Sequence, residues 1–240
     1  MQNIVLILSL LCLSFESLAQ EPDRQLIQSE AKLFTTKANG YETIQTNSQG
    51  VKGSQFYPVV WSPGELQTSD NSRFNFGYLF MLDKVHQQLF VEETATSNIM
   101  NIEKVQIKKL RITAEGRDHI FGIADIYLNL KEGIFCEILV ENNNKYSLIK
   151  TVTTKYIRAD NAGFAKMKEG EFNDEFVDNA TYYILRPSLS AKKVTFKEKS
   201  IQNAFKEKDT ADDYLNKNEF IKKDEYFLIN IVNYINESLK

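Results

Sequence analysis

The sequence predicts a mainly β fold of the α+β class, with a short α-helical segment at the C-terminal end. Residues 51–196 contain short runs of β-branched and aromatic residues bounded by Gly, Asn, Asp or Pro, a pattern typical of strands. Brief polar turns separate these runs and no crossover helix lies between them, which argues against parallel βαβ units. After Phe196 the chain becomes rich in lysine, and its apolar residues take helical spacing. These observations favour an antiparallel sheet, a sandwich or an open barrel, followed by helices.

The β-rich domain, residues 51–196, is expected to hold nine short strands. In the run 105–113 charged and apolar residues occur on both sides, so neither face of that strand is purely apolar. Residues 141–145 are expected to form a hairpin loop, and residues 131–133 a tighter turn. The expected strands are 64–68, 74–82, 87–92, 105–113, 120–130, 133–141, 146–157, 181–186 and 191–196.

The C-terminal segment, residues 197–240, is predicted to be helical and to pack on the β-rich domain. Ser200 is expected to cap a helix that reaches about residue 207, and Asp209 or Thr210 a second helix that ends near residue 216. A third helix is expected from about residue 224 to 239, with an apolar stripe on the domain and a polar side in solvent. The stripe consists of Phe227, Ile231, Tyr234 and Ile235, and the polar side of Asn230, Asn233, Asn236 and Glu237.

Residues 1–19 are predicted to be a secretory signal peptide. An uncharged apolar run covers residues 4–15, which is too short for a permanent membrane span of about 20 residues. Ser17 and Ala19 are small residues at the positions that a signal peptidase reads, so cleavage is expected between Ala19 and Gln20. A polar lead-in covers residues 20–50, with a short helix expected around 26–34. The chain is therefore expected to be exported, to the periplasm, to the outer membrane or into the medium.

The charge balance shows no bias toward nucleic acids or anionic membranes. The chain carries 29 Lys and Arg against 32 Asp and Glu, a formal net charge of −3, and a near-neutral chain has no overall electrostatic attraction to polyanions. After the signal peptide, no apolar run approaches membrane length. Cys136 is then the only cysteine, so no intramolecular disulfide can form and stability must come from burial. Its apolar neighbours predict a buried thiol.

The sequence shows no motif for metal, cofactor or catalytic chemistry. His86, His119 and Cys136 lack paired ligand spacing, and the acidic residues between 169 and 178 lack the pattern of a calcium loop. The stretch 50–54 fits neither a nucleophile elbow nor a phosphate loop. No metal, no cofactor and no catalytic residue is therefore expected.

Aromatic residues are in surplus between residues 56 and 80, and they supply the candidates for ligand binding. On a single strand 74–82, four rings would share one face: Phe74, Phe76, Tyr78 and Phe80. Core packing is the favoured role of such rings, and an apolar or stacking surface for a ligand is the alternative. Trp61, the only tryptophan, is expected on a loop. The candidate contacts for a ligand are Trp61, Tyr57 and Tyr78.

The stretch Val51-Lys52-Gly53-Ser54-Gln55-Phe56-Tyr57, followed by Gly64-Glu65-Leu66 and an aromatic strand, resembles a known sequence motif that precedes a β-rich region. The motif, Lys-Gly-Ser-x-aromatic, belongs to a family of uncharacterised exported β-rich proteins abundant in Bacteroidetes. In that family a lysine-rich segment and a short helical end close the chain, which Lys192-Lys193, Lys197-Glu198-Lys199 and residues 214–234 resemble. Gln55 stands where the family usually has proline. The resemblance implies export and a β-rich fold, and it implies no functional residue because the family has no established activity.

The leading hypothesis is an exported, non-catalytic protein of the cell envelope that binds an apolar ligand, a glycan or a protein partner. It agrees with the missing catalytic motifs and the many apolar strand residues. A carboxylate-dependent envelope hydrolase is the first alternative, and it would show paired acids that converge in a cleft. An accessory structural component of an envelope assembly is the second, and it would show an exposed apolar patch or sheet edge and no pocket.

Overall fold

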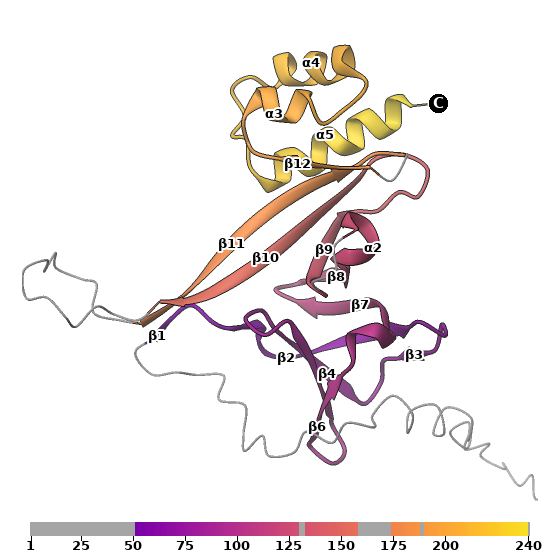
Figure 1. Ribbon diagram of the computed structural model, residues 1–240, viewed down its shortest axis with the longest axis vertical. Helices are drawn as coiled ribbons and strands as arrows, with labels where there is room; N and C mark the ends of the chain where they lie inside the picture. Colours follow the sequence, from indigo (N-terminus) through magenta and orange to yellow (C-terminus); the bar gives the residue numbers. More distant parts are fainter. Residues whose placement is uncertain (1–50, 130–132, 158–173, 188–189, 240) are drawn as a thin grey trace, which may run out of the picture.

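The computed structural model describes residues 51–129, 133–157, 174–187 and 190–239. These residues form one open, mostly antiparallel sheet of twelve strands, followed by C-terminal helices (Figure 1). The predicted mainly β class with a helical end is confirmed, and the sheet is open. The predicted signal peptide, the polar lead-in and the helix expected around 26–34 lie outside the described residues.

The sheet has the order β1-β11-β10-β9-β8-β7-β2-β4-β5-β6, with β12 paired to β11 and β3 to β2. Only the pairing of β1 with β11 is parallel within the described sheet. The long β10–β11 hairpin runs from the helices to β1, and β2, β4 and β6 lie at the end away from the helices (Figure 1). The strands are β1 (Val51–Lys52), β2 (Phe56–Thr68), β3 (Arg73–Phe74), β4 (Tyr78–Asp83), β5 (Gln88–Glu93), β6 (Asn98–Ile102), β7 (Ile107–Ala114), β8 (Arg117–Ile123), β9 (Phe135–Val140), β10 (Ser147–Ile157), β11 (Asp174–Leu185) and β12 (Ala191–Val194).

Strand β2 is much longer than the predicted strand 64–68, and it includes Trp61. Its first part pairs with β4 and its second part with β7, and the change of partner falls between Pro63 and Gly64. Proline is tolerated there because the strand leaves one ladder for another. At Gly64 an added Cβ would lie 2.2 Å from the carbonyl oxygen of Arg111, so only glycine allows this approach. The expectation of a loop at Trp61 is therefore wrong.

Two of the expected strands are interrupted. The run 74–82 divides into β3 and β4 around a turn, where Gly77 has a φ of 87° and Phe76 is 92% exposed. The four rings therefore do not share one face. The run 120–130 ends as a strand at Ile123, and helix α2 (Ala124–Leu128) follows it. A helix thus separates β8 from β9, and residues 131 and 132 of the expected tight turn lie outside the described residues.

Polar sequence also forms strand where none is expected, because backbone hydrogen bonds to a neighbouring strand hold it in the sheet. The edge strand β6 contains two asparagines and was not predicted, and β11 begins at Asp174, well before the expected residue 181. A short 3-10 helix, η1 (Lys104–Gln106), precedes β7. At the β2–β7 pairing the register shifts, since Gln67 pairs with Lys109 and Thr68 with Ile107. Because of the extra residue in β7, the strict alternation of buried and exposed side chains is broken there. Ile107 and Leu110, which would otherwise point to opposite faces, are both buried.

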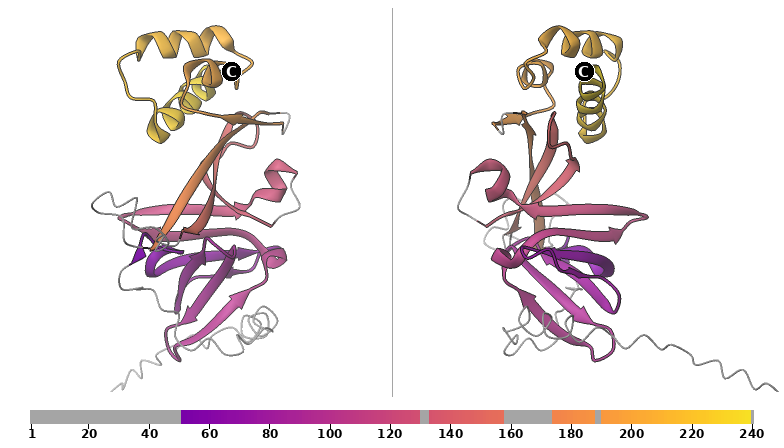
Figure 2. Two further views of the ribbon diagram at one scale, coloured as in Figure 1. Left: turned by 60° about the vertical axis from the view of Figure 1, so that its left-hand side comes forward. Right: turned by 90° about the vertical axis from the view of Figure 1, so that its right-hand side faces the viewer.

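The C-terminal helices lie over the end of the sheet formed by β9 to β12 (Figure 2). They are α3 (Glu198–Gln202), α4 (Lys208–Lys217) and α5 (Glu225–Ser238). Asp224 caps α5 by accepting a hydrogen bond from the backbone of Phe227 at 3.2 Å. Ile231 and its apolar neighbours on α5 form one buried cluster with Tyr146 and Leu148 of the sheet side. None of the helices in the described part of the chain has the length and hydropathy needed to cross a bilayer.

Asn236 does not face solvent, contrary to the prediction for the polar side of the last helix. It is buried, and its amide accepts from the backbone N–H of Tyr146 and donates to the carbonyl of the same residue, each at 2.8 Å. The chain that enters β10 passes directly over this position. The side chain of Asn236 therefore makes the two hydrogen bonds to the backbone of Tyr146 that a neighbouring strand would otherwise make.

Candidate functional site

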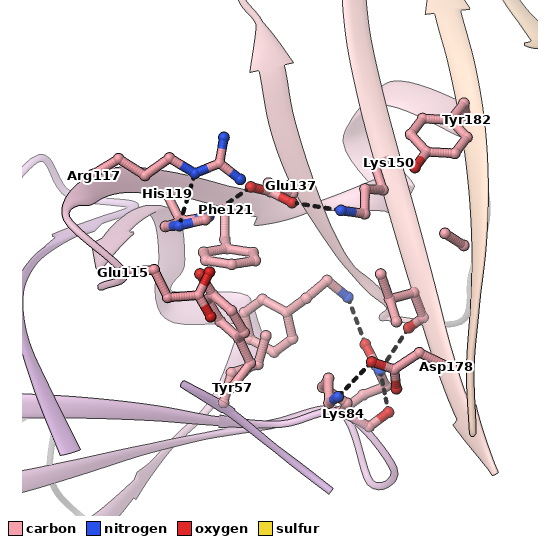
Figure 3. A pocket seen from close by; sticks show the side chains of 15 residues that line it. Tyr57, Lys84, Glu115, Arg117, His119, Phe121, Glu137, Lys150, Asp178 and Tyr182 are labelled. Carbon is pink, nitrogen blue, oxygen red and sulfur yellow. Dashed lines mark hydrogen bonds and ion pairs between the residues drawn. The ribbon is translucent and has the colours of Figure 1, made fainter. Parts of the chain in front are cut away.

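A cavity of about 350 Å³ lies where β8 to β11 meet β2 and the β4–β5 turn (Figure 3). Its lining combines apolar side chains with charged ones from several strands. The lining residues are Tyr57, Leu82, Lys84, Gln87, Glu115, Arg117, His119, Phe121, Phe135, Glu137, Lys150, Val152, Asp178, Ala180 and Tyr182.

Strand register places four polar side chains in a row along one wall of this cavity. Lys150 of β10 lies opposite Glu137 of β9 and opposite Tyr182 of β11. On β8, His119 lies two residues before Phe121, which pairs with Glu137, so His119 points to the same face. The row therefore consists of one side chain from each of four neighbouring strands.

His119 and Glu137 are buried and hydrogen-bonded to each other. Nδ1 of His119 lies 2.7 Å from Oε1 of Glu137, and only 3% of His119 is exposed. On the other side of the ring, Nε of Arg117 donates to Nε2 of His119 at 3.2 Å. Because a guanidinium can only donate, Nε2 is the acceptor, and the ring proton lies on Nδ1 and is donated to Glu137. Both partners thus fix the orientation of the ring.

Lys150 connects this pair to the start of α5. Its Nζ lies 3.2 Å from Oε2 of Glu137 and 2.8 Å from Oε2 of Glu225, and the hydroxyl of Tyr182 donates to the same Glu225 oxygen at 2.9 Å. Burial alone would lower the pKa of Lys150, but the hydrogen bonds and charges of Glu225 and Glu137 outweigh it, so the pKa is raised. Burial and the contact with Glu225 raise the pKa of Tyr182. With Glu225 between Lys150 and Tyr182, the row becomes a chain of alternating donors and acceptors.

Tyr57 of β2 contributes a buried hydroxyl that lacks a hydrogen-bond partner among the described residues. Its ring meets His119 edge-on, with centroids 5.1 Å apart, and lies 5.6 Å from the ring of Phe121. Burial raises the pKa of Tyr57, the carboxylates of Glu115 and Glu137 raise it further, and Arg117 lowers it. The phenol therefore stays protonated. A buried hydroxyl with no partner costs about 1–3 kcal/mol, which a polar atom beside it would offset.

The opposite wall is held by the turn between β4 and β5. Nζ of Lys84 forms an ion pair with Asp178 of β11 at 2.6 Å. The side chain of Gln87 accepts from the backbone N–H of Phe135 at 2.8 Å and donates to the carbonyl of Lys84 at 2.6 Å. These bonds join the two parts of the bent sheet around the cavity.

The β7–β8 hairpin forms one side of the opening. Ala114 pairs with Arg117, so Glu115 and Gly116 are the two turn residues, with φ values of 53° and 77°. Two left-handed residues are typical of a tight hairpin turn, in which Asn, Asp and Gly are usual at the first position and glutamate is not. Glu115 and Arg117 are both exposed; in Figure 3 the side chain of Glu115 extends toward Tyr57, and that of Arg117 ends beside His119.

Of the three predicted ligand contacts, the structure brings only Tyr57 to the cavity. Trp61 is half-buried in β2 and packs against a cluster of Phe56, Met81 and Phe90. Tyr78 is half-buried against the main cluster of the sheet. Ligand binding by any of them stays a prediction.

Sequence reasoning missed the charged wall, although a signal was present. Glu137 and Lys150 are single charges inside the apolar runs 134–140 and 148–152. A charge at such a position is buried only with a partner, so each predicts a polar contact. Cys136, the neighbour of Glu137, points to the opposite face and is buried as predicted, and its burial raises the pKa of its thiol to about 12.

The described residues contain no group of three or more His, Cys, Asp or Glu side chains placed to hold a metal ion. The two histidines have separate partners, since Nδ1 of His86 lies 2.7 Å from Asp83. Part of the acidic run, residues 169–173, lies outside the described residues.

No protein-family model, no curated protein and no solved structure matches this chain.

Proposed function

We propose that this chain is an exported protein that binds a small molecule in the cavity between β2 and β8 to β11. The observation that carries the proposal is the cavity itself, which combines an apolar body with convergent polar groups. Its volume, about 350 Å³, lies in the usual range for small-molecule sites, roughly 300–1,000 Å³.

The partners of the polar groups favour binding over bond cleavage. None of the fifteen residues that line the cavity is Ser, Thr or Cys, the common nucleophiles. The two oxygens of Glu137 are occupied by His119 and Lys150. A network in which each member has a partner gives a rigid wall, and a rigid wall lowers the entropic cost of binding.

Export is the second part of the proposal, and it is supported by the sequence alone. The apolar run 4–15 and the small residues Ser17 and Ala19 have the pattern of a cleaved signal peptide. The resemblance to exported β-rich proteins agrees with it. The ligand would then be a compound met in the cell envelope.

Native mass spectrometry of the protein purified from the envelope of the cells that make it tests the proposal. Ala180→Trp places a large side chain in the cavity from an exposed position of β11. Asn179→Trp is the matched control, because neighbouring residues of a strand point to opposite faces. The parent and Asn179→Trp are expected to carry an additional small mass that Ala180→Trp lacks. A parent protein without bound mass, or equal loading of both variants, would contradict the proposal.

A further inference from the structure

The opening of the cavity holds two side chains of opposite charge that are not neutralised by the described residues. Glu115 makes no hydrogen bond or ion pair there, and Arg117 uses only its Nε, which donates to His119. Its two terminal nitrogens have no partner in the described part of the chain. Deeper in the cavity, in contrast, Glu137 and Lys150 are paired with each other. The unused charges therefore lie where a ligand would enter.

From this arrangement we propose that the cavity takes a free α-amino acid with an apolar side chain, its carboxylate on Arg117 and its ammonium group on Glu115. The inference rests on the proposed function and names the ligand class of the same cavity. The buried hydroxyl of Tyr57, which lacks a partner in the described residues, is a further polar group of the same cavity.

The chemistry of each group favours this assignment. The free edge of a guanidinium presents two parallel N–H donors, which match a carboxylate. A lone carboxylate beside it repels a second anion and attracts an ammonium group. A neutral polyol would leave both full charges without a counter-charge, and a simple anion would leave Glu115 unmatched. A zwitterion with adjacent charges matches both.

The apolar lining suits the side chain of such a ligand. Phe121 and Phe135 are buried, and with Leu82 and Val152 they form the apolar part of the cavity wall. Burying an apolar side chain against these residues supplies binding energy without a further polar partner. The charged opening and the apolar interior together specify the two ends of the ligand.

The conformation of Glu115 gives a further reason to assign it a role. A non-glycine residue with a φ of 53° in the first turn position costs free energy that Asn, Asp or Gly would largely avoid. In this conformation the side chain extends toward the cavity and Tyr57 (Figure 3). A residue that only closed a hairpin would gain nothing from a longer acidic side chain here.

Isothermal titration calorimetry with three matched probes tests the inference. The probes are L-phenylalanine, 3-phenylpropionate, which lacks the amino group, and 2-phenylethylamine, which lacks the carboxylate. The exported protein should bind L-phenylalanine about tenfold or more tightly than either analogue, because each analogue loses one charge-assisted contact. Arg117→Gln should weaken L-phenylalanine and 3-phenylpropionate and leave 2-phenylethylamine unchanged. Glu115→Gln should weaken L-phenylalanine and 2-phenylethylamine and leave 3-phenylpropionate unchanged or tighter.

The reciprocal pattern separates recognition from general damage, since a misfolded variant would lose all three probes. Failure of L-phenylalanine to bind, or binding of 3-phenylpropionate as tightly as L-phenylalanine, overturns the inference. The proposed function would survive that result if native mass spectrometry still found a molecule that Ala180→Trp excludes. It would fail as well if no bound mass were found.

Discussion

Replacing Ile231 by Ala removes three carbon atoms from the centre of the interface between α5 and the sheet. Ile231 is 0% exposed and belongs to the cluster that joins the helices to Tyr146, Leu148 and Ile184. Moving each of these carbons from water into the core is worth about 0.8 kcal/mol, and the cavity left behind adds to the cost. The free energy of unfolding should therefore fall by about 3 kcal/mol. Alanine has the highest helix propensity, so a loss of stability cannot be attributed to the helix alone.

Asn233→Ala is the matched control, because Asn233 is exposed on the same helix and should change the free energy of unfolding by less than about 0.5 kcal/mol. Urea unfolding followed by circular dichroism should give a lower midpoint for Ile231→Ala with an unchanged slope, and Tm should fall by roughly 6–12 °C. Equal midpoints for both variants would show that α5 does not pack on the sheet. A second, earlier transition in Ile231→Ala would show that the helices unfold separately.

Four further predictions can be checked with standard measurements. The mass of the exported protein should correspond to cleavage between Ala19 and Gln20, and a mass that includes the first residue would contradict the signal peptide. EDTA or a reductant should leave Tm unchanged, and a fall of several degrees would reveal a metal or a disulfide. Raising the pH from about 9 toward 12 should lower the free energy of unfolding, because the thiol of Cys136, whose pKa is normally near 9.0, has a pKa of about 12 in the fold and keeps its proton longer there than in the unfolded chain. In Cys136→Ala the free energy of unfolding should fall less steeply with pH over this range, and an equally steep fall would assign the loss to other groups. Asn236→Ala should cost about 2–3 kcal/mol in urea unfolding, because it leaves the backbone N–H and carbonyl of Tyr146 without partners, and a cost as small as that of an exposed asparagine would contradict this pairing.

The class of the fold could be predicted because it depends on local patterns. Period-two alternation, turn residues and the apolar spacing of the last helix are each visible within about ten residues. The interruptions were harder to predict. Phe76 belongs to an apolar alternation, yet Gly77 with its φ of 87° turns the chain there. The glycine was the available signal, since an isolated glycine in a strand often marks a bend or a bulge.

The charged wall of the cavity could not be predicted, because it depends on register between strands. The pairing of β9 with β10 shifts by one residue, with Leu148 opposite Val140 and Ile149 opposite Ile138. A one-residue slip moves every side chain of a strand to the other face. Without this irregularity, the side chains of Glu137 and Lys150 would point to opposite faces of the sheet. A single sequence shows that each charge needs a partner, but not which one.

Glu225 shows how the helical segment and the cavity depend on each other. It follows the capping residue Asp224, in the first turn of α5, where the helix dipole favours an acidic side chain. The same carboxylate lies 2.8 Å from Nζ of Lys150 and accepts from the hydroxyl of Tyr182, both of which line the cavity. Without α5, Lys150 would retain Glu137 as its partner, and the hydroxyl of Tyr182 would lose its acceptor. Docking of the helix therefore completes the hydrogen bonding of the cavity wall, which makes the C-terminal segment part of the proposed binding site and not a separate appendage.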